Sequence, residues 1–383
     1  RNGMWLPLSF PTALALALTS LACWGSWSNA AKAAGDLPFP LFYLDFSIGV
    51  FSTAILVFLS LGSSQFTHDG SAFAWDVPAL SALCAGGVFN VANVLLVAGI
   101  GLAGLAVAFP VAIGTALVLG TTLTFFIDSG GADPSLLFAG VGVAFTAILV
   151  QVAANLSYKR DVEQGKDSPL AAATAGEVSA WLTDEQRLPN EAELCEAAPA
   201  AAHGTWYGIG VCAISGLLMA CWSPLSALSM DTNRFPSGSL TPYGSSLLFT
   251  AAVFVTSPVL CKILMVYPLV GPRSTYRAYV ELPPVAHVWG LLGGVVWAVG
   301  TIANLISGDK LSLALSYAIG QAAPMVATLW GLLYYHEFRG ARAPTYLLVL
   351  GMMMLYSLAV VLVAASKGAD HAPPPPAPPL GHA

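Results

Sequence analysis

Ten long apolar runs constrain the fold of this chain more than any other feature of its sequence. About 20 apolar residues cross a bilayer as an α-helix, and in hydrocarbon only a self-bonded backbone such as a helix is stable. The runs cover residues 7–30, 40–62, 78–100, 104–127, 135–158, 204–230, 243–267, 285–307, 311–335 and 343–366. The sequence therefore predicts an all-α integral membrane protein with ten transmembrane helices, and Pro110 and Pro224 predict kinks or hinges in two of them. The first run also resembles a signal peptide, but it is too long for one and has a counterpart later in the chain.

Charge is scarce and unevenly placed. Only 9% of the 383 residues are charged, against roughly a quarter in an ordinary soluble domain. Thirteen of the charged residues lie between Lys159 and Glu196, which indicates a single polar, acidic loop at 159–203. This distribution excludes a water-soluble enzyme and a disordered chain. The net charge of −6 leaves no basic surface for nucleic acid.

The motifs indicate no catalytic, metal or cofactor site. Six cysteines without a C-x-x-C pair fit neither a disulfide framework nor a zinc site. Gly99-x-Gly101-x-x-Gly104 has the spacing of a dinucleotide fingerprint, but it lies in a turn between two apolar runs, and we interpret it as a helix hairpin. The P-loop, H-E-x-x-H and G-x-S-x-G motifs do not occur. We therefore expect neither an enzyme nor a bound cofactor or metal.

Short motifs of the first half recur in the same order in the second half. The pairs are ACWGS at 22–26 with ACWSP at 220–224, Tyr43 with Tyr243, Gly86-Gly87 with Gly293-Gly294, Leu105–Val111 with Leu313–Ile319, and Phe125–Asp128 with Tyr334–Glu337. Their collinear order predicts two five-helix repeats, residues 1–158 and 204–368. Because five is odd, the second repeat enters the membrane from the opposite side, and the repeats are inverted, as in many transporters. Chance similarity among helices rich in Ala, Leu and Gly is the alternative.

The basic residues predict the orientation of the chain, because Lys and Arg gather in cytosolic loops. The loops after the odd-numbered runs hold ten of them, and the other side holds four. The loop at 159–203 is then cytosolic, and both termini are not. The Pro-rich tail at 369–383 is expected to be a solvated end without a partner.

Polar and aromatic side chains within the runs are the candidates for a substrate site, because polar groups in hydrocarbon are costly unless they are paired or face water. The candidates are Trp24, Ser26, Asn90, Asn93, Trp222, Trp297, Asn304, Tyr317 and Gln321. Trp297 aligns with Asn90 between the repeats. Each residue alone is more typical of contacts between helices. Together, the amides and aromatic rings favour a small, flat, neutral ligand with N–H and C=O edges over an anionic nucleotide.

Four ionisable residues near the ends of the runs are candidates for coupling or gating: Lys32, Asp45, Lys262 and Glu337. Asp45 lies a few residues inside the second run. It either reaches the membrane surface, or it carries a coupled proton or takes part in a gate, with Lys32 or Lys262 supplying charge from the same side. Glu337 closes the ninth run, either in an ion-pair cluster at the surface or as part of an inner gate.

Several stretches together resemble a known family. They are Tyr43-Leu44-Asp45-Phe46, GTTLTFFID at 120–128, and AAPMVATLWG at 322–331 followed by Tyr334–Arg339, with Trp-Gly-Ser in the first run. In these the sequence resembles the plant ureide permeases of the drug/metabolite transporter superfamily, over residues 10–368. The resemblance implies ten spans in a five-plus-five inverted arrangement, with a large cytosolic loop after the fifth.

The resemblance also implies a function: uptake of allantoin-like ureides and of nucleobases such as uracil, coupled to protons, by alternating access at the plasma membrane. The acidic central loop lacks the nucleotide-loop-like signature of some members, and the eighth run is richer in Trp and Val. A sugar or other metabolite carrier of the same superfamily therefore stays open, as does a non-transporting membrane scaffold subunit. The partners expected are a small-molecule substrate, protons and the lipid bilayer, and the sequence leaves a homodimer open.

Overall fold

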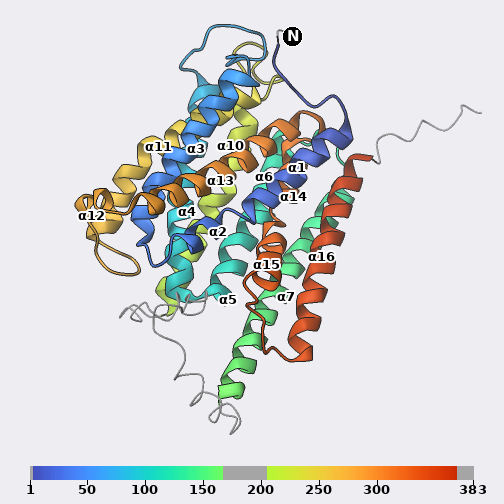
Figure 1. The fold of residues 1–383 in the computed structure, drawn as a ribbon. Coiled ribbons are helices and arrows are strands. Elements are labelled where there is room, and N and C mark those ends of the chain that lie inside the picture. The colour runs from blue at the N-terminus through green and yellow to red at the C-terminus, as the bar shows by residue number, and fades with distance from the viewer. Residues whose placement is uncertain (1–2, 167–204, 369–383) are drawn as a thin grey trace, which may run out of the picture.

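The chain folds into a bundle of helices (Figure 1). A computed structural model describes residues 3–166 and 205–368, so most of the predicted loop 159–203 and the tail 369–383 lie outside the described residues. The helices are α1 (Phe10–Trp24), α2 (Ser28–Ala33), α3 (Phe39–Ser60), α4 (Val77–Ala103), α5 (Leu105–Ala108), η1 (Phe109–Ile113), α6 (Gly114–Ile127), α7 (Pro134–Lys166), α10 (Thr205–Ser229), α11 (Pro242–Val266), α12 (Tyr276–Val280), α13 (Pro284–Leu311), α14 (Leu313–Gly320), α15 (Ala323–Leu333) and α16 (Ala343–Gly368).

Nine segments of the described chain are long and apolar enough to cross a membrane. They coincide with nine of the ten predicted runs. The first run instead forms α1, of 15 residues, and the short α2. The two helices separate at Gly25, where a side chain would collide with Ala323 O and Val326 of α15. The all-α membrane fold is therefore confirmed.

Several helices begin where the sequence provides a cap. Asp76 accepts the N–H of Ala79 at the start of α4 (3.2 Å), and Thr241 accepts that of Gly244 at the start of α11 (2.9 Å). Each of these helices also has a proline in its first turn, where its missing N–H costs no helix bond.

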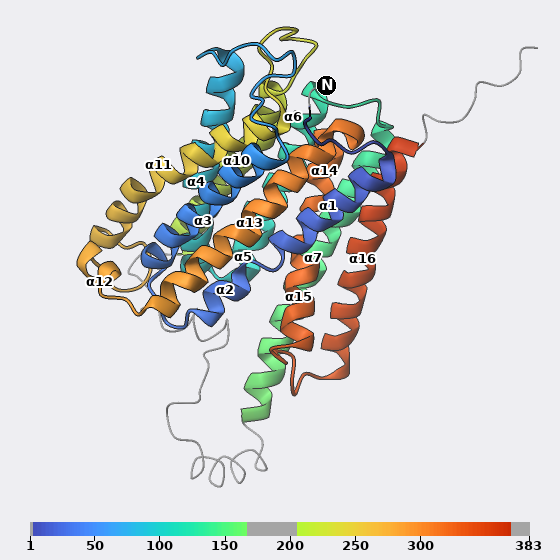
Figure 2. The same cartoon turned by 45° about the horizontal axis from the view of Figure 1, so that its top comes forward.

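The helices pair in a pattern that repeats between the two halves of the chain. α4 packs on α10 and α13 packs on α1, while α3 packs on α13 and α11 packs on α4. In the same way α6 packs on α10 and α14 packs on α1, and α3 lies against α11. α7 and α16 stand side by side at one edge of the bundle in both ribbon views (Figures 1 and 2).

Two of the segments that fill a predicted run are broken helices. The fourth run consists of α5, the π-helical turn η1 and α6. Pro110 lies in η1, so the kink predicted there takes the form of a π-turn, as expected where a proline removes a helix bond. The ninth run breaks at Gln321–Ala322, between α14 and α15. Pro224, by contrast, lies inside the continuous helix α10.

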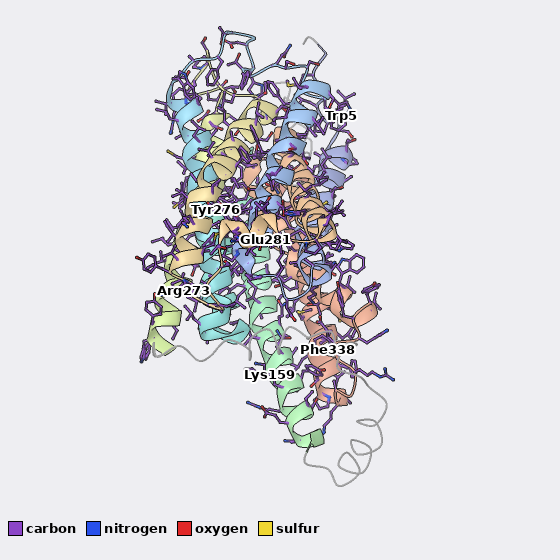
Figure 3. All side chains as sticks on the ribbon, turned by 60° about the vertical axis from the view of Figure 1, so that its left-hand side comes forward. Trp5, Lys159, Arg273, Tyr276, Glu281 and Phe338 are labelled. Atoms are coloured by element: carbon purple, nitrogen blue, oxygen red, sulfur yellow. The ribbon has the colours of Figure 1, made fainter. Side chains whose placement is uncertain are left out.

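The bundle has two ends, named here from Figure 1. The upper end carries residues 61–76, 128–133 and 230–241, and the lower end carries residues 25–38, 267–283 and 334–342. Figure 3 shows Trp5 near the upper end and Lys159 and Phe338 towards the lower end. At the upper end the connections bond to one another, for example through Thr241 N–H to Phe66 O (2.7 Å) and Ser237 Oγ to Asp69 (2.8 Å).

Candidate functional site

Trp222 of α10 is the centre of an aromatic cluster contributed by both halves of the chain. Its ring centroid lies 5.4 Å from that of Tyr317, 5.6 Å from Phe249, 5.9 Å from Trp24 and 6.2 Å from Phe89. All four contacts are edge-on, a geometry that aromatic pairs favour. Trp222 is buried, with 2% of its surface exposed. Three of the predicted site residues, Trp24, Trp222 and Tyr317, therefore lie together.

Trp297 of α13 extends this cluster. Its ring lies 4.8 Å from Phe89, 5.9 Å from Phe46 and 6.2 Å from Phe249. The backbone explains this arrangement, because Gly294 faces Phe46 O just as Gly86 faces Phe249 O, at positions where a Cβ would not fit.

Phe89 of α4 and Trp297 of α13 form an aromatic contact between the two halves of the chain. Phe89 and Trp297 each follow such a glycine by three residues and contact each other. Trp297, which the sequence comparison aligned with Asn90, thus makes its ring contact with Phe89, the residue before Asn90. The close contact is made by the first glycine of the pair in α4 and by the second in α13.

Asn90 belongs to a neighbouring network in which every part of its amide is used. Its Oδ1 accepts the hydroxyl of Tyr43 (2.8 Å), and its Nδ2 lies within bonding distance of Val253 O, Thr256 Oγ1 and Ser257 Oγ on α11 (3.2, 2.7 and 3.1 Å). Asn93 donates to the same Tyr43 hydroxyl (3.1 Å). These bonds tie α4 to α3 and α11. The amides of Asn90 and Asn93 thus act as links between helices in this structure.

Asn304 of α13 is bonded differently. Its Nδ2 donates to Ser316 O (2.9 Å), while its Oδ1 has no hydrogen-bond partner although the residue is fully buried. Trp24 lies close by: its Nε1 donates to Thr301 Oγ1 (3.1 Å), and it packs against Gly320. Asn304 therefore presents a carbonyl oxygen without a partner near the aromatic cluster.

The remaining predicted binding residues lie around the broken ninth segment. The Tyr317 hydroxyl donates to Ala116 O of α6 (3.0 Å), and Gly120 leaves room for its ring. Gln321 is half-buried at the break itself. Ser26 accepts the indole N–H of Trp330 (2.8 Å), which places it on the lower side of Trp24.

Asp45 is almost completely buried, with 3% of its surface exposed. Its Oδ1 accepts the hydroxyl of Tyr279 on α12 (2.7 Å), and its Oδ2 lies 2.8 Å from Nδ1 of His287 on α13. Gly290 permits this packing, because a Cβ there would lie 2.5 Å from that of Asp45. Burial, and then the hydrogen bond to Asp45, raise the pKa of Tyr279, so its hydroxyl stays a donor.

The lysines predicted as partners of Asp45 are engaged elsewhere. Lys32 forms an ion pair with Glu337 (2.6 Å) and lies 4.4 Å from the ring centroid of Tyr335. Lys262 is exposed, 5.5 Å from the ring centroid of Tyr276. The ion pair joins α2 to the chain after α15 at the lower end. In the described part of the chain, no three His, Cys, Asp or Glu side chains gather as a metal site would require.

The sequence profile of the ureide permease family matches residues 42–203 and 191–366. The chain belongs to the ureide permease family. A ureide permease is a transporter, not an enzyme, and this member is a multi-pass integral membrane protein. It is 27% identical to ureide permease 5 of Arabidopsis thaliana, over 96% of this chain and 97% of that protein. It is 26% identical to ureide permease 4 of the same plant, over 95% of this chain and 99% of that one.

Structural comparison shows a related fold. A solved crystal structure without a functional name matches this ureide permease family member with a TM-score of 0.51, over 93% of this chain and 99% of that one, at 18% identity. A similarity at this level of identity indicates the fold alone.

The sequence did not reveal several residues of the site. Phe89 and Phe249 are apolar residues within apolar runs, and Thr301 is one of many hydroxyl residues, so nothing in the sequence marks them. His287 carried a usable signal, because a histidine inside an apolar run needs a partner. Its partner lies 242 residues away in sequence, beyond the reach of any local pattern.

Proposed function

We propose that the chain is a secondary active transporter of small, neutral, polar metabolites, namely ureides such as allantoin and nucleobases such as uracil. The observation that carries the proposal is the match to the ureide permease family over most of the chain. The buried aromatic cluster around Trp222, with the amide of Asn304 beside it, supports it. Flat rings can stack on or pack against such a cluster, and an amide can bond either N–H or C=O.

The proposed architecture is ten spans in two inverted five-helix repeats, residues 1–158 and 204–368, joined by the loop 159–203 and followed by the tail 369–383. α1 is then a short first span. The exchanged helix pairings between the halves support this, as do the matching close contacts at Gly86 and Gly294. Breaks in the fourth and ninth segments fall in corresponding places, and paired discontinuous helices are typical of transporter binding sites.

The lower end is the cytosolic end in this proposal, because its loops, together with Lys262 and the loop 159–203, hold ten of the fourteen Lys and Arg, and such residues gather on the cytosolic side. The loop 159–203 is then cytosolic, both termini face away from the cytosol, and the membrane is the plasma membrane. Measuring the mass of the detergent-solubilised protein tests whether it forms a homodimer.

The proposed mechanism is alternating access, with the described conformation closed at the upper end. All eight residues of α14, in the upper half of the ninth segment, are buried. In α15, in the lower half, the buried residue is Gly331. An opening at the lower end would lead to the break at Gln321 and to Trp24.

The proposed binding residues are the aromatic Trp24, Trp222, Trp297 and Tyr317 and the polar Ser26, Asn90, Asn93, Asn304 and Gln321. For Asn90 and Asn93 the role is indirect, since their amides hold α3, α4 and α11 together. Asp45 with His287 is the proposed proton site, and Lys32 with Glu337 is the proposed lower gate. Lys262 belongs to the same end, as a charge at the membrane surface.

Uptake into proteoliposomes tests the function. We expect uptake of labelled allantoin or uracil, accelerated when the pH gradient is directed so that protons accompany the substrate. An active preparation that takes up neither compound would remove the ureide and nucleobase assignment. Competition by sugars but by neither compound would identify the sugar carrier instead. Uptake without a response to the gradient would remove proton coupling alone.

Asp45→Asn tests the proton site. The amide cannot carry a proton between the two sides, so we expect loss of gradient-driven accumulation with binding retained. The matched control is Asp36→Asn, which removes an exposed carboxylate just before the same helix. Unchanged accumulation in Asp45→Asn would assign Asp45 a structural role.

A further inference from the structure

Two buried polar atoms without partners lie on helices that face each other, α1 and α13. One is Asn304 Oδ1 and the other is Ser20 Oγ, and both residues have 0% of their surface exposed. Buried polar atoms are nearly always bonded, and one that is not calls for an explanation. In a membrane protein the cost is higher, because no bulk water reaches such an atom.

The orientation of the Asn304 amide is fixed by its surroundings. Its Nδ2 donates to Ser316 O (2.9 Å), and turning the amide over would place two carbonyl oxygens together. The Ser316 hydroxyl also donates to Asn304 O (2.9 Å) and lies 2.5 Å from the hydroxyl of Ser307. The hydroxyl bonds fix the main chain of Asn304 against Ser316, and Ser316 O accepts Nδ2, so Oδ1 is the part of the side chain left for another partner.

Asn304 lies beside Trp24. Gly320 separates them: a Cβ there would lie 2.5 Å from Trp24 Cζ3 and 3.3 Å from Asn304 Nδ2. A residue larger than glycine would push the indole and the amide apart. The free carbonyl oxygen therefore belongs to the same neighbourhood as the aromatic cluster around Trp222.

Ser20 of α1 lies at about the same height in the bundle as Asn304 of α13. α1 and α13 are antiparallel, because α1 ends at residues 25–38 of the lower end whereas α13 begins after residues 267–283 of the same end. Gly300 of α13 faces Cys23, Trp24 and the main-chain oxygen of Ser20 on α1. Ser20 is one turn above Trp24 on α1, and Asn304 is one turn above Gly300 on α13. The two residues therefore lie one turn from the same contact, in the same direction, and their side-chain oxygens do not bond each other.

We propose that Asn304 Oδ1 accepts an N–H of the transported ligand and that the Ser20 hydroxyl bonds the adjacent ligand carbonyl, with Trp24 packing against the ligand's flat face. The inference rests on the proposed function and names the recognised chemistry: a cyclic ureide or imide edge, with an N–H next to a C=O. A carbonyl oxygen as the free acceptor requires a donor on the ligand. It therefore selects for N–H compounds and against their N-methylated forms.

The test measures competition with uracil uptake in proteoliposomes by N1-methyluracil and N3-methyluracil. In the wild type we expect methylation at the recognised nitrogen to weaken competition by about tenfold or more, because a site built to bond an N–H rejects an analogue that lacks it. In Asn304→Leu we expect weaker uracil uptake and the loss of this discrimination. Ser20→Ala should weaken uptake while discrimination between the methylated compounds persists.

The controls separate recognition from folding. Thr19→Ala removes the neighbouring hydroxyl, which is exposed and bonded to Ala15 O, and we expect no change in uptake or discrimination. Asn304→Leu should lower the melting temperature less than Asn90→Leu does. In Asn90→Leu, the groups that bond the Asn90 amide would lose their hydrogen-bond partner.

Discrimination that persists in Asn304→Leu would overturn the inference and leave the proposed function standing. Absence of both uptake and ligand-induced stabilisation in the wild type would overturn the proposed function, and the inference with it.

Discussion

The two broken segments meet at the upper end of the bundle and separate at the lower end. At the upper end, Asp128 at the end of α6 accepts the backbone N–H of Leu313 at the start of α14 (2.6 Å). Lys367 bonds Gly130 O beside this contact, and Tyr317 bonds Ala116 O one level below. Each contact joins the fourth or the tenth segment to its neighbours, so the upper end is closed by several independent bonds.

The lower end is held in another way. α15 lies against α1 and α16 rather than against α5. Its bonds include those from Trp330 to Ser26 and from Ser357 of α16 to Met325, and the Lys32–Glu337 ion pair follows just after it. Trp330 and Leu333 of α15 are 40% and 69% exposed. The comparison teaches that the two broken segments are in contact at the upper end, through α6 and α14, and apart at the lower end, where α5 and α15 lie. A transporter that works by alternating access needs such an asymmetry, which must be able to reverse.

The largest effect is expected from locking the upper end. Asp128→Cys with Leu313→Cys, joined by a short bifunctional methanethiosulfonate that forms a disulfide with each cysteine, in a background without native cysteines, should abolish uptake, because α6 and α14 can no longer separate. A reducing agent should restore it. Each single substitution treated with the same reagent is the control. Full uptake by the cross-linked protein would show that the upper end does not open.

A smaller effect is expected at the lower end. Lys32→Gln or Glu337→Gln should change the uptake rate by only a few-fold, because an ion pair that water partly reaches contributes roughly 1 kcal/mol or less. The exchange of the two charges, Lys32→Glu with Glu337→Lys, should restore much of the rate. If the exchange is no better than the single substitutions, the pair does not act as a gate.

The smallest effect is expected at the upper connections, where pH provides the probe. Hydrogen bonds from Ser71, and then from Ser237, hold the pKa of Asp69 well below its usual range. A lowered pKa in the folded state means that Asp69 contributes stability above the ordinary aspartate value of about 3.9 and loses it as the pH falls further.

The melting temperature of Asp69→Asn should therefore be slightly lower than that of the wild type at pH 7, and the gap should close as the pH falls through the acid range. A gap that stays constant with pH would mean that the charge of Asp69 does not stabilise these connections.

Much of the fold was readable from the sequence, because hydrophobic length alone marks a helix in a membrane. α1 is shorter than its apolar run since Gly25 allows α15 to approach, a contact 298 residues away that no local pattern contains. The convergence of Trp24, Trp222 and Tyr317 was foreseeable, because the same Ala-Cys-Trp motif occurs in both halves.

The chemistry of the individual amides was not foreseeable. Asn90 and Asn304 are both asparagines within apolar runs. Both polar atoms of the Asn90 side chain are bonded, whereas Asn304 has a free carbonyl oxygen. What distinguishes them is the presence of Thr256 and Ser257 opposite Asn90, which depends on how α11 packs on α4. For the same reason the sequence assigned lysine partners to Asp45, whereas the fold brings His287 and Tyr279 to it.

One-sided labelling of Gln321→Cys tests the central claim most directly, because Gln321 lies at the break of the ninth segment, next to the proposed site. In a background without native cysteines, a membrane-impermeant thiol reagent applied from the lower end should label this position, and saturating allantoin or uracil should protect it. The same reagent applied from the upper end should label it far more slowly. Equal labelling from both ends, or labelling that neither compound slows, would contradict the account.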